Sequence, residues 1–152
     1  MPWRVWFHRG VRFLSAALSR RRNSPQPMHM ERGQLGERAA ARFLRQQGLR
    51  FLTANFRSKR GEIDLVFRDG DCLVFVEVKT RSEGRWVRPA AAVDRGKRRR
   101  LSRAALDYLG ELRQPRLAFR FDIVEVRLRD GKVAGIRHLP GAFRLSEPYR
   151  YG

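Results

Sequence analysis

The chain has 152 residues, enough for one domain with a single hydrophobic core, and its formal net charge is +19. Such an excess of positive charge indicates a polyanionic partner, and nucleic acid is the natural one. The single cysteine, Cys72, excludes an intrachain disulfide and a cysteine-built zinc site, and no apolar run reaches the roughly 20 residues of a membrane span. We therefore expect a cytoplasmic protein.

Residues 1–32 precede the pattern of a folded domain and form a basic extension. Arginines interrupt its apolar residues, which is not the composition of a signal peptide. We interpret the segment as disordered, and a weak amphipathic helix touching anionic lipid or nucleic acid is an alternative. Translation beginning at Met28 or Met30 would remove it. We place the domain at residues 33–139 and an irregular tail at 140–152.

The first expected element is a helix from Gly33 to Gln47, followed by Gly48 as a stop signal. Glu37 lies off the centre of the apolar stripe, where an exposed glutamate is favourable in the first turn of a helix. The stripe consists of Leu35, Ala39, Ala40, Phe43 and Leu44.

A short strand is expected at Leu49 to Leu52, and residues 54–60 then lead as a loop into the next strand. This loop is basic and comes immediately before Asp64, where a bound phosphate backbone would run. A solvated loop is the alternative. The cations concerned are Arg57, Lys59 and Arg60.

Residues 62–68 and 73–80 predict the two strands of a hairpin around the Asp69-Gly70 turn signal. Alternation puts one wholly apolar face toward the core and places Asp64, Glu77 and Lys79 on the other. A four-residue loop makes Asp64 and Glu77 direct partners about 5 Å apart at Cβ, whereas a two-residue loop makes them diagonal neighbours at about 7 Å. The apolar face holds Ile63, Leu65, Phe67, Val74, Val76 and Val78.

Two carboxylates about 4 Å apart repel by roughly 4 kcal/mol at an effective dielectric of 20, so this face needs a compensating charge. A divalent cation or a lysine would supply it. Mg²⁺ or Mn²⁺ suits carboxylate oxygens and can lower the pKa of a bound water that attacks a phosphodiester. Lys79 could orient that water or stabilise charge on the phosphate. The alternative is a surface face that carries solubilising charges.

A second helix is expected from the N-cap Asp94 to about Leu112, with Leu101, Ala105 and Tyr108 on its buried stripe. Its first turns hold six cations and no acid between Arg95 and Arg103, and their mutual repulsion favours a phosphate partner over a merely solvated face. These cations are Arg95, Lys97, Arg98, Arg99, Arg100 and Arg103.

Residues 116–128 predict a strand, and Asp130-Gly131 turns it into another strand at 133–139. Phe119, Phe121 and Ile123 share one face of the first of these strands, and Asp122 lies on the other. We interpret Asp122 as a structural carboxylate rather than a metal ligand.

The runs Gly-Glu-Ile-Asp-Leu-Val at 61–66 and Phe-Val-Glu-Val-Lys-Thr-Arg at 75–81 resemble the core of PD-(D/E)XK nucleases. More closely, residues 33–126 resemble the YraN-like family, uncharacterised protein family 0102. The resemblance implies a restriction-endonuclease-like α/β core with a mixed central β-sheet flanked by helices. It also implies that Asp64 and Glu77 hold a metal, that Lys79 is catalytic, and that Glu37 joins the metal site. Lys97 matches a lysine of the family pattern.

The sequence therefore favours a nuclease dependent on Mg²⁺ or Mn²⁺, or a nuclease-like protein, that acts on structured, damaged or single-stranded DNA. A DNA- or RNA-binding module without turnover and an adaptor that docks a protein are the alternatives. No small-molecule cofactor is expected, and the oligomeric state stays open. The predicted nucleic-acid contacts are Arg57, Lys59, Arg60, Arg81, Lys97, Arg98, Arg99 and Arg100.

Overall fold

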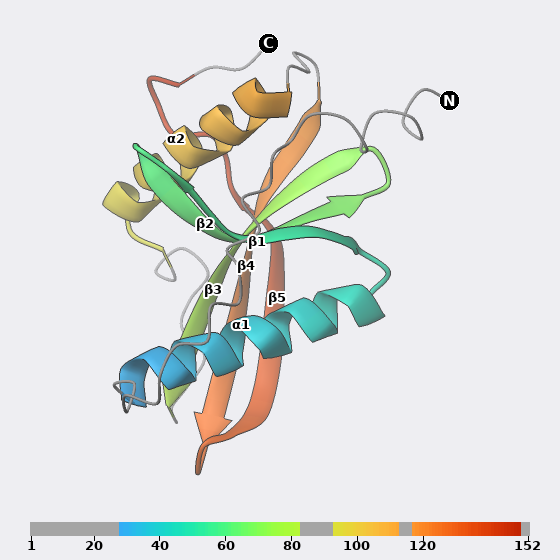
Figure 1. Cartoon of the computed structure of the whole chain (residues 1–152), viewed down its shortest axis with the longest axis vertical. Coiled ribbons are helices and arrows are strands. Elements are labelled where there is room, and N and C mark those ends of the chain that lie inside the picture. The colour runs from blue at the N-terminus through green and yellow to red at the C-terminus, as the bar shows by residue number, and fades with distance from the viewer. Residues whose placement is uncertain (1–27, 83–92, 113–116, 150–152) are drawn as a thin grey trace, which may run out of the picture.

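A computed structural model describes residues 28–82, 93–112 and 117–149, so most of the predicted basic extension lies outside the described residues. One five-stranded sheet has its strands in chain order, with β3 and β4 parallel and every other neighbouring pair antiparallel. Two helices pack against it (Figure 1), which confirms the expected α/β class with a mixed sheet. The elements are α1 Met28–Gln46, β1 Arg50–Ser58, β2 Gly61–Asp69, β3 Cys72–Ser82, α2 Arg95–Leu112, β4 Ala118–Arg129 and β5 Lys132–Phe143.

Helix α1 begins at Met28 rather than at the predicted Gly33, so part of the expected extension is helical. It ends as predicted: Gly48 has a φ of 90°, and its N–H and that of Leu49 bond back to the carbonyls of Arg45 and Leu44. The buried part of the helix packs against one face of the sheet. That core contains Ala40, Ala41, Leu44, Leu65, Phe67, Val74, Val76, Val124, Val126 and Leu128.

Helix α2 covers the other face beside β1 and β2. Its expected N-cap is confirmed, because Lys97 N–H donates to Asp94 Oδ1 at 2.8 Å. A Cβ on Gly61 would lie 2.5 Å from the carbonyl oxygen of Arg100, so only glycine allows α2 to lie this close to the start of β2. Neither helix in the described part of the chain is long and apolar enough to cross a membrane.

Strand β1 is longer than predicted. It runs from Arg50 to Ser58, through residues that were expected to form a loop, and pairs with β2. The side chain of Phe56, opposite Ile63 in this ladder, packs edge-on against Tyr108 of α2 with ring centroids 5.0 Å apart. Packing against α2 therefore extends β1, while Lys59 and Arg60 form its turn into β2.

The β2–β3 hairpin confirms the apolar face for five of its six predicted members, with Val78 at its rim. Ile63 is the exception, because it packs in the opposite core with Val66 and Phe75. Pairing between β2 and β3 ends at Leu65 and Val76, and β2 then curls away with β1 toward α2 (Figure 1). This twist turns Ile63 to the α2 side of the sheet.

Strands β4 and β5 form the second predicted hairpin. Strand β5 does not end at Leu139 but continues to Phe143 after a register shift, and its Phe143 ring stacks on Phe121 at 4.7 Å. Beyond the strand, Ser146 N–H donates to the buried Ser102 hydroxyl of α2 at 3.0 Å. Strand β5 thus takes in residues 140–143 of the expected tail, whereas residues 144–149 form neither helix nor strand and contact α2 through Ser146.

Candidate functional site

The candidate site lies where β2 and β3 separate. The backbone pairing of β2 with β3 ends at Leu65 and Val76. At the next residue of β2 a side chain bridges the two strands, because Asp64 Oδ2 accepts the Val78 N–H at 2.7 Å. The register of the hairpin is the one that points Asp64 toward Glu77. The fork therefore leaves a half-buried carboxylate between the two strands.

Glu77 is the most buried acid of the site, with 3% of its side chain exposed. Lys79 Nζ lies 2.7 Å from its Oε1, and Lys97 Nζ, from the first turn of α2, lies 3.2 Å from its Oε2. The second contact is an ion pair without hydrogen-bond geometry. The buried Glu77 Oε2 therefore accepts no hydrogen bond. Two lysines thus supply part of the compensating charge that Glu77 requires.

Burial raises the pKa of Asp64 to about 7, and the negative charge of Glu77 adds to this shift. The Val78 N–H and the Lys97 ammonium act in the opposite direction without cancelling it. The Asp64 carboxyl group therefore keeps its proton to a much higher pH than an exposed aspartate does. A cation that binds there must displace that proton, as metal ions do at carboxylate sites.

Glu37 reaches the same region from α1. Burial raises its pKa; a hydrogen bond from Asn55 opposes the shift, and the charges of Glu62 and Glu77 add to it. Asn55 itself adopts a φ of 53°, a left-handed conformation that asparagine tolerates better than most residues. The sequence pattern does not identify this contact of Asn55 with Glu37.

The donor set is suited to a hard divalent cation. Four carboxyl groups lie in this region: the charges of Glu62 and Glu77 act on Glu37, and those of Glu37 and Glu77 act on Asp64. Lys79, Lys97 and Arg57 are the cations paired with Glu77 and Glu62, so the described part of the site holds more acids than cations. Within the described residues no three acidic, histidine or cysteine side chains lie close enough to form a ready-made metal cluster. Mg²⁺ is commonly held by one or two carboxylates together with water, for which Asp64 and Glu77 suffice.

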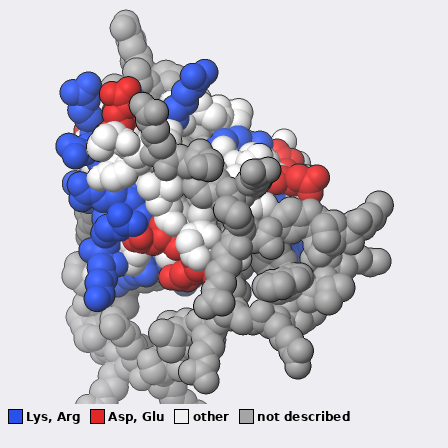
Figure 2. Space-filling model, turned by 90° about the horizontal axis from the view of Figure 1, so that it is seen from above, with Lys and Arg blue, Asp and Glu red and all other residues white. Residues whose placement is uncertain are grey.

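Apart from Lys97, whose ammonium group lies beside Glu77, the predicted nucleic-acid contacts fall into two groups. Figure 2 shows Lys and Arg side chains gathered along one side of the surface, next to acidic residues. Arg60 is held by Asp107 of α2, and Arg98 donates to the Val93 carbonyl at 3.0 Å and lies over the Phe143 ring. The exposed group consists of Arg57, Lys59, Arg81, Arg99 and Arg100.

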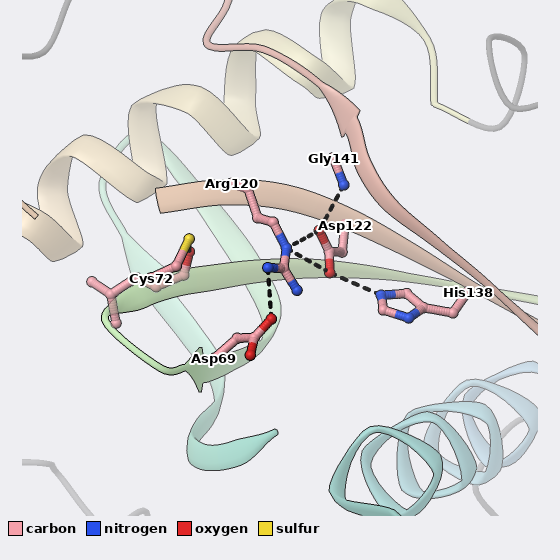
Figure 3. A network of polar contacts seen from close by, with 7 residues as sticks. Asp69, Cys72, Arg120, Asp122, His138 and Gly141 are labelled. Carbon is pink, nitrogen blue, oxygen red and sulfur yellow. Dashed lines mark hydrogen bonds and ion pairs between the residues drawn. The ribbon is translucent and has the colours of Figure 1, made fainter. Parts of the chain in front are cut away.

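Asp122 lies apart from the site, in a network of its own (Figure 3). It accepts Arg120 Nε at 3.0 Å and the Gly141 N–H at 2.9 Å, and His138 Nε2 lies 2.8 Å away. Burial alone would raise the pKa of Asp122, but these three partners together hold it below its usual range. Asp122 of β4 thus holds Gly141 and His138 of β5 at the register shift, which is a structural role for this carboxylate.

Sequence reasoning missed a second buried acid on the α2 side of the sheet. Glu125 of β4 is 1% exposed, accepts Arg137 Nε at 2.7 Å and has no hydrogen bond to its Oε1. It stands beside Lys79 in the parallel β3–β4 register. Residues 79 and 125 are far apart in the chain, so only the strand order brings them together.

Comparison of the sequence with known proteins places the chain in a family. The sequence pattern of uncharacterised protein family UPF0102 matches residues 36–126. A UPF0102 protein of Trichlorobacter lovleyi is 43% identical over 115 residues, covering 75% of this chain and 91% of the relative. A UPF0102 protein of Symbiobacterium thermophilum is 50% identical over 94 residues, covering 62% and 80%. The fork residues Asp64 and Glu77 and the lysines beside them fall inside the matched segment, and the chain belongs to the UPF0102 family.

Proposed function

We propose that the protein is a metal-dependent nuclease that hydrolyses phosphodiester bonds in structured or damaged DNA. The observation that carries this proposal is the pairing at the strand fork of the half-buried Asp64 with the buried Glu77, whose Oε2 accepts no hydrogen bond. Exposed Arg57 lies 3.9 Å from Glu62 Oε2 beside the site. An electron-deficient cation and a polyanionic substrate are the two partners that such a surface favours.

The finer fold assignment, a restriction-endonuclease-like core, belongs to this proposal. Its support is the motif resemblance at 61–66 and 75–81 together with the mixed sheet that carries both runs on neighbouring strands. The site lies at the fork between these strands. Fold alone would not imply an activity, so the proposal rests on the site.

Each residue has a defined task in the proposed reaction. Asp64 and Glu77 would hold Mg²⁺ or Mn²⁺, which when bound polarises a phosphoryl oxygen and lowers the pKa of a water molecule. Lys79, fixed by Glu77 Oε1, places its ammonium group where it can donate to a phosphate oxygen or orient the attacking water. The exposed Arg99 and Arg100 would bind the flanking phosphates.

The deciding experiment incubates the purified protein with linear, branched, nicked and single-stranded DNA and with RNA, in Mg²⁺, in Mn²⁺ and in chelator. We expect cleavage of at least one DNA structure in the presence of metal and none in chelator. Glu77→Gln should abolish the cleavage, whereas Glu111→Gln, which removes an exposed acid at the far end of α2, should not. Absence of cleavage together with absence of Mn²⁺ binding would refute the proposal.

One observation favours a second function, that of a nucleic-acid-binding module without turnover. Both oxygens of Glu77 already lie beside lysines, which is how a buried acid is neutralised without a metal. This alternative predicts salt-dependent binding of DNA or RNA that chelator does not change. It also predicts no heat on titration of Mn²⁺, so the same protein preparation separates the two functions.

A further inference from the structure

Lys97 differs from the other cations at the start of α2. Its ammonium group lies 3.2 Å from Glu77 Oε2 and 3.8 Å from Glu62 Oε1, and only 16% of its side chain is exposed. Arg95 and Arg99, two positions away on either side, are exposed. One cation of the basic run therefore points into the acidic site, whereas Arg95 and Arg99 are exposed and Arg98 is held by the Val93 carbonyl.

The position of Lys97 is fixed by the fold rather than by its own side chain. The Asp94 cap holds the Lys97 N–H and sets the first turn of α2. The close approach of Gly61 to the Arg100 carbonyl then sets the helix against β2, the strand that carries Asp64. Any movement of Lys97 away from Glu77 is thus a side-chain movement over a fixed backbone.

The two lysines hold Glu77 differently. Lys79 contacts Oε1 at 2.7 Å from the same strand, whereas the contact of Lys97 with Oε2 is longer and lacks hydrogen-bond geometry. The longer, undirected contact is the weaker one. A divalent cation that binds Glu77 therefore displaces Lys97 before Lys79, because Lys97 has the weaker contact and the positive charge of the cation repels it.

We propose, on the basis of the proposed nuclease function, that Lys97 is an exchangeable counter-ion that couples metal binding to substrate binding. Without a divalent cation its ammonium group lies beside Glu77 Oε2, where the cation would bind. When a cation binds Glu77, Lys97 swings to a phosphate group of the bound strand. Lys97 is in this role a positioning residue for the site, and the two binding events strengthen each other.

Titration calorimetry with Mn²⁺ tests the first half of this proposal. Lys97→Met keeps the stem of the side chain but removes the competing charge, so Mn²⁺ affinity should rise about fivefold to tenfold. Lys97→Arg should stay near wild type. Arg95→Met removes one charge from the same turn, where it does not point at Glu77, and should change the affinity by less than about twofold. Lys97→Gln carries the same test if the methionine variant does not fold.

Fluorescence anisotropy with a labelled DNA oligonucleotide, in Ca²⁺ and in chelator, tests the second half. Ca²⁺ should tighten binding to wild type because it releases Lys97 to the phosphate backbone, and this gain should largely disappear in Lys97→Met. A gel run afterwards shows whether the oligonucleotide is intact, and only intact samples are compared.

Two results would overturn the coupling. If Lys97→Met binds Mn²⁺ no more tightly than Arg95→Met does, Lys97 does not compete with the cation. If Lys97→Met loses the same factor of DNA affinity in Ca²⁺ and in chelator, Lys97 is an ordinary phosphate contact that metal binding does not affect. A wild type and a Lys97→Met variant that both bind no Mn²⁺ would instead refute the proposed metal-dependent function, and the coupling would fall with it.

Discussion

Asp64 should make the protein less stable at neutral and alkaline pH, and Asp64→Asn should relieve this. Burial and the charge of Glu77 raise the pKa of this acid, so the folded state holds its proton more tightly than the unfolded chain does. The penalty is absent below pH about 4, where both states are protonated, grows as the unfolded chain ionises, and is complete once the pH has risen through about 7. Asparagine keeps an oxygen that can accept the Val78 N–H and never becomes charged.

The size of the effect follows from the shift of the pKa from 3.8 to about 7. At roughly 1.4 kcal/mol per pKa unit, the ionised Asp64 costs the folded state about 4 kcal/mol at pH 8. At pH 5 the folded protein keeps its proton and only the unfolded chain is ionised, so the cost falls to about 1.5 kcal/mol. Asp64→Asn should therefore gain stability relative to wild type, and this gain should be about 2 to 3 kcal/mol larger at pH 8 than at pH 5.

Urea unfolding of both proteins in chelator, followed by circular dichroism at pH 5 and pH 8, measures this difference. Asp71→Asn is the control, since Asp71 lies exposed in the β2–β3 turn and should shift stability by less than about 0.5 kcal/mol at either pH. An Asp64→Asn variant that is less stable than wild type at pH 8 would refute the reasoning. It would mean that the acid is held by favourable contacts rather than exposed to repulsion.

Three further predictions test other parts of the structure. Asp122→Asn should lose about 2 to 3 kcal/mol at pH 7, because its pKa is lowered in the folded state, and the loss should shrink as acid protonates wild-type Asp122; thermal unfolding at pH 7 and pH 3 measures it. Gly61→Ala should cost more than about 1 kcal/mol, since the new methyl group meets the Arg100 carbonyl, and an unchanged melting temperature would contradict the close approach of α2. DNA affinity should fall linearly with the logarithm of salt concentration, with a slope reduced by about one in Arg99→Gln, and a salt-independent affinity would refute phosphate binding.

Local signals in the sequence were sufficient for the end of α1, for the start of α2 and for most of the apolar face of the first hairpin. The glycine at 48 and the aspartate at 94 act where the backbone itself needs them, so the end of α1 and the start of α2 could be read directly. Alternation likewise placed Glu77 and Lys79 on one face, as the structure has them. These features depend only on residues close together in the chain.

Long-range packing determined what the sequence could not predict. The length of β1 depends on Phe56 meeting Tyr108, and the reversal of Ile63 depends on β2 leaving β3. The alternation rule assumes a straight ladder, and it fails where the ladder divides. The approach of Lys97 to Glu77 requires the docked position of α2, which no spacing within the run of cations reveals.

The crossover between β3 and β4 has a consequence for the order in which this site is assembled. Lys79 lies before the crossover and Lys97 within it, on the helix that the parallel pairing of β3 with β4 requires. A chain that has formed only the β2–β3 hairpin therefore has its two acids side by side without one of their counter-ions. Docking of α2 brings Lys97 to Glu77, so closure of the sheet and neutralisation of this acid are linked in free energy.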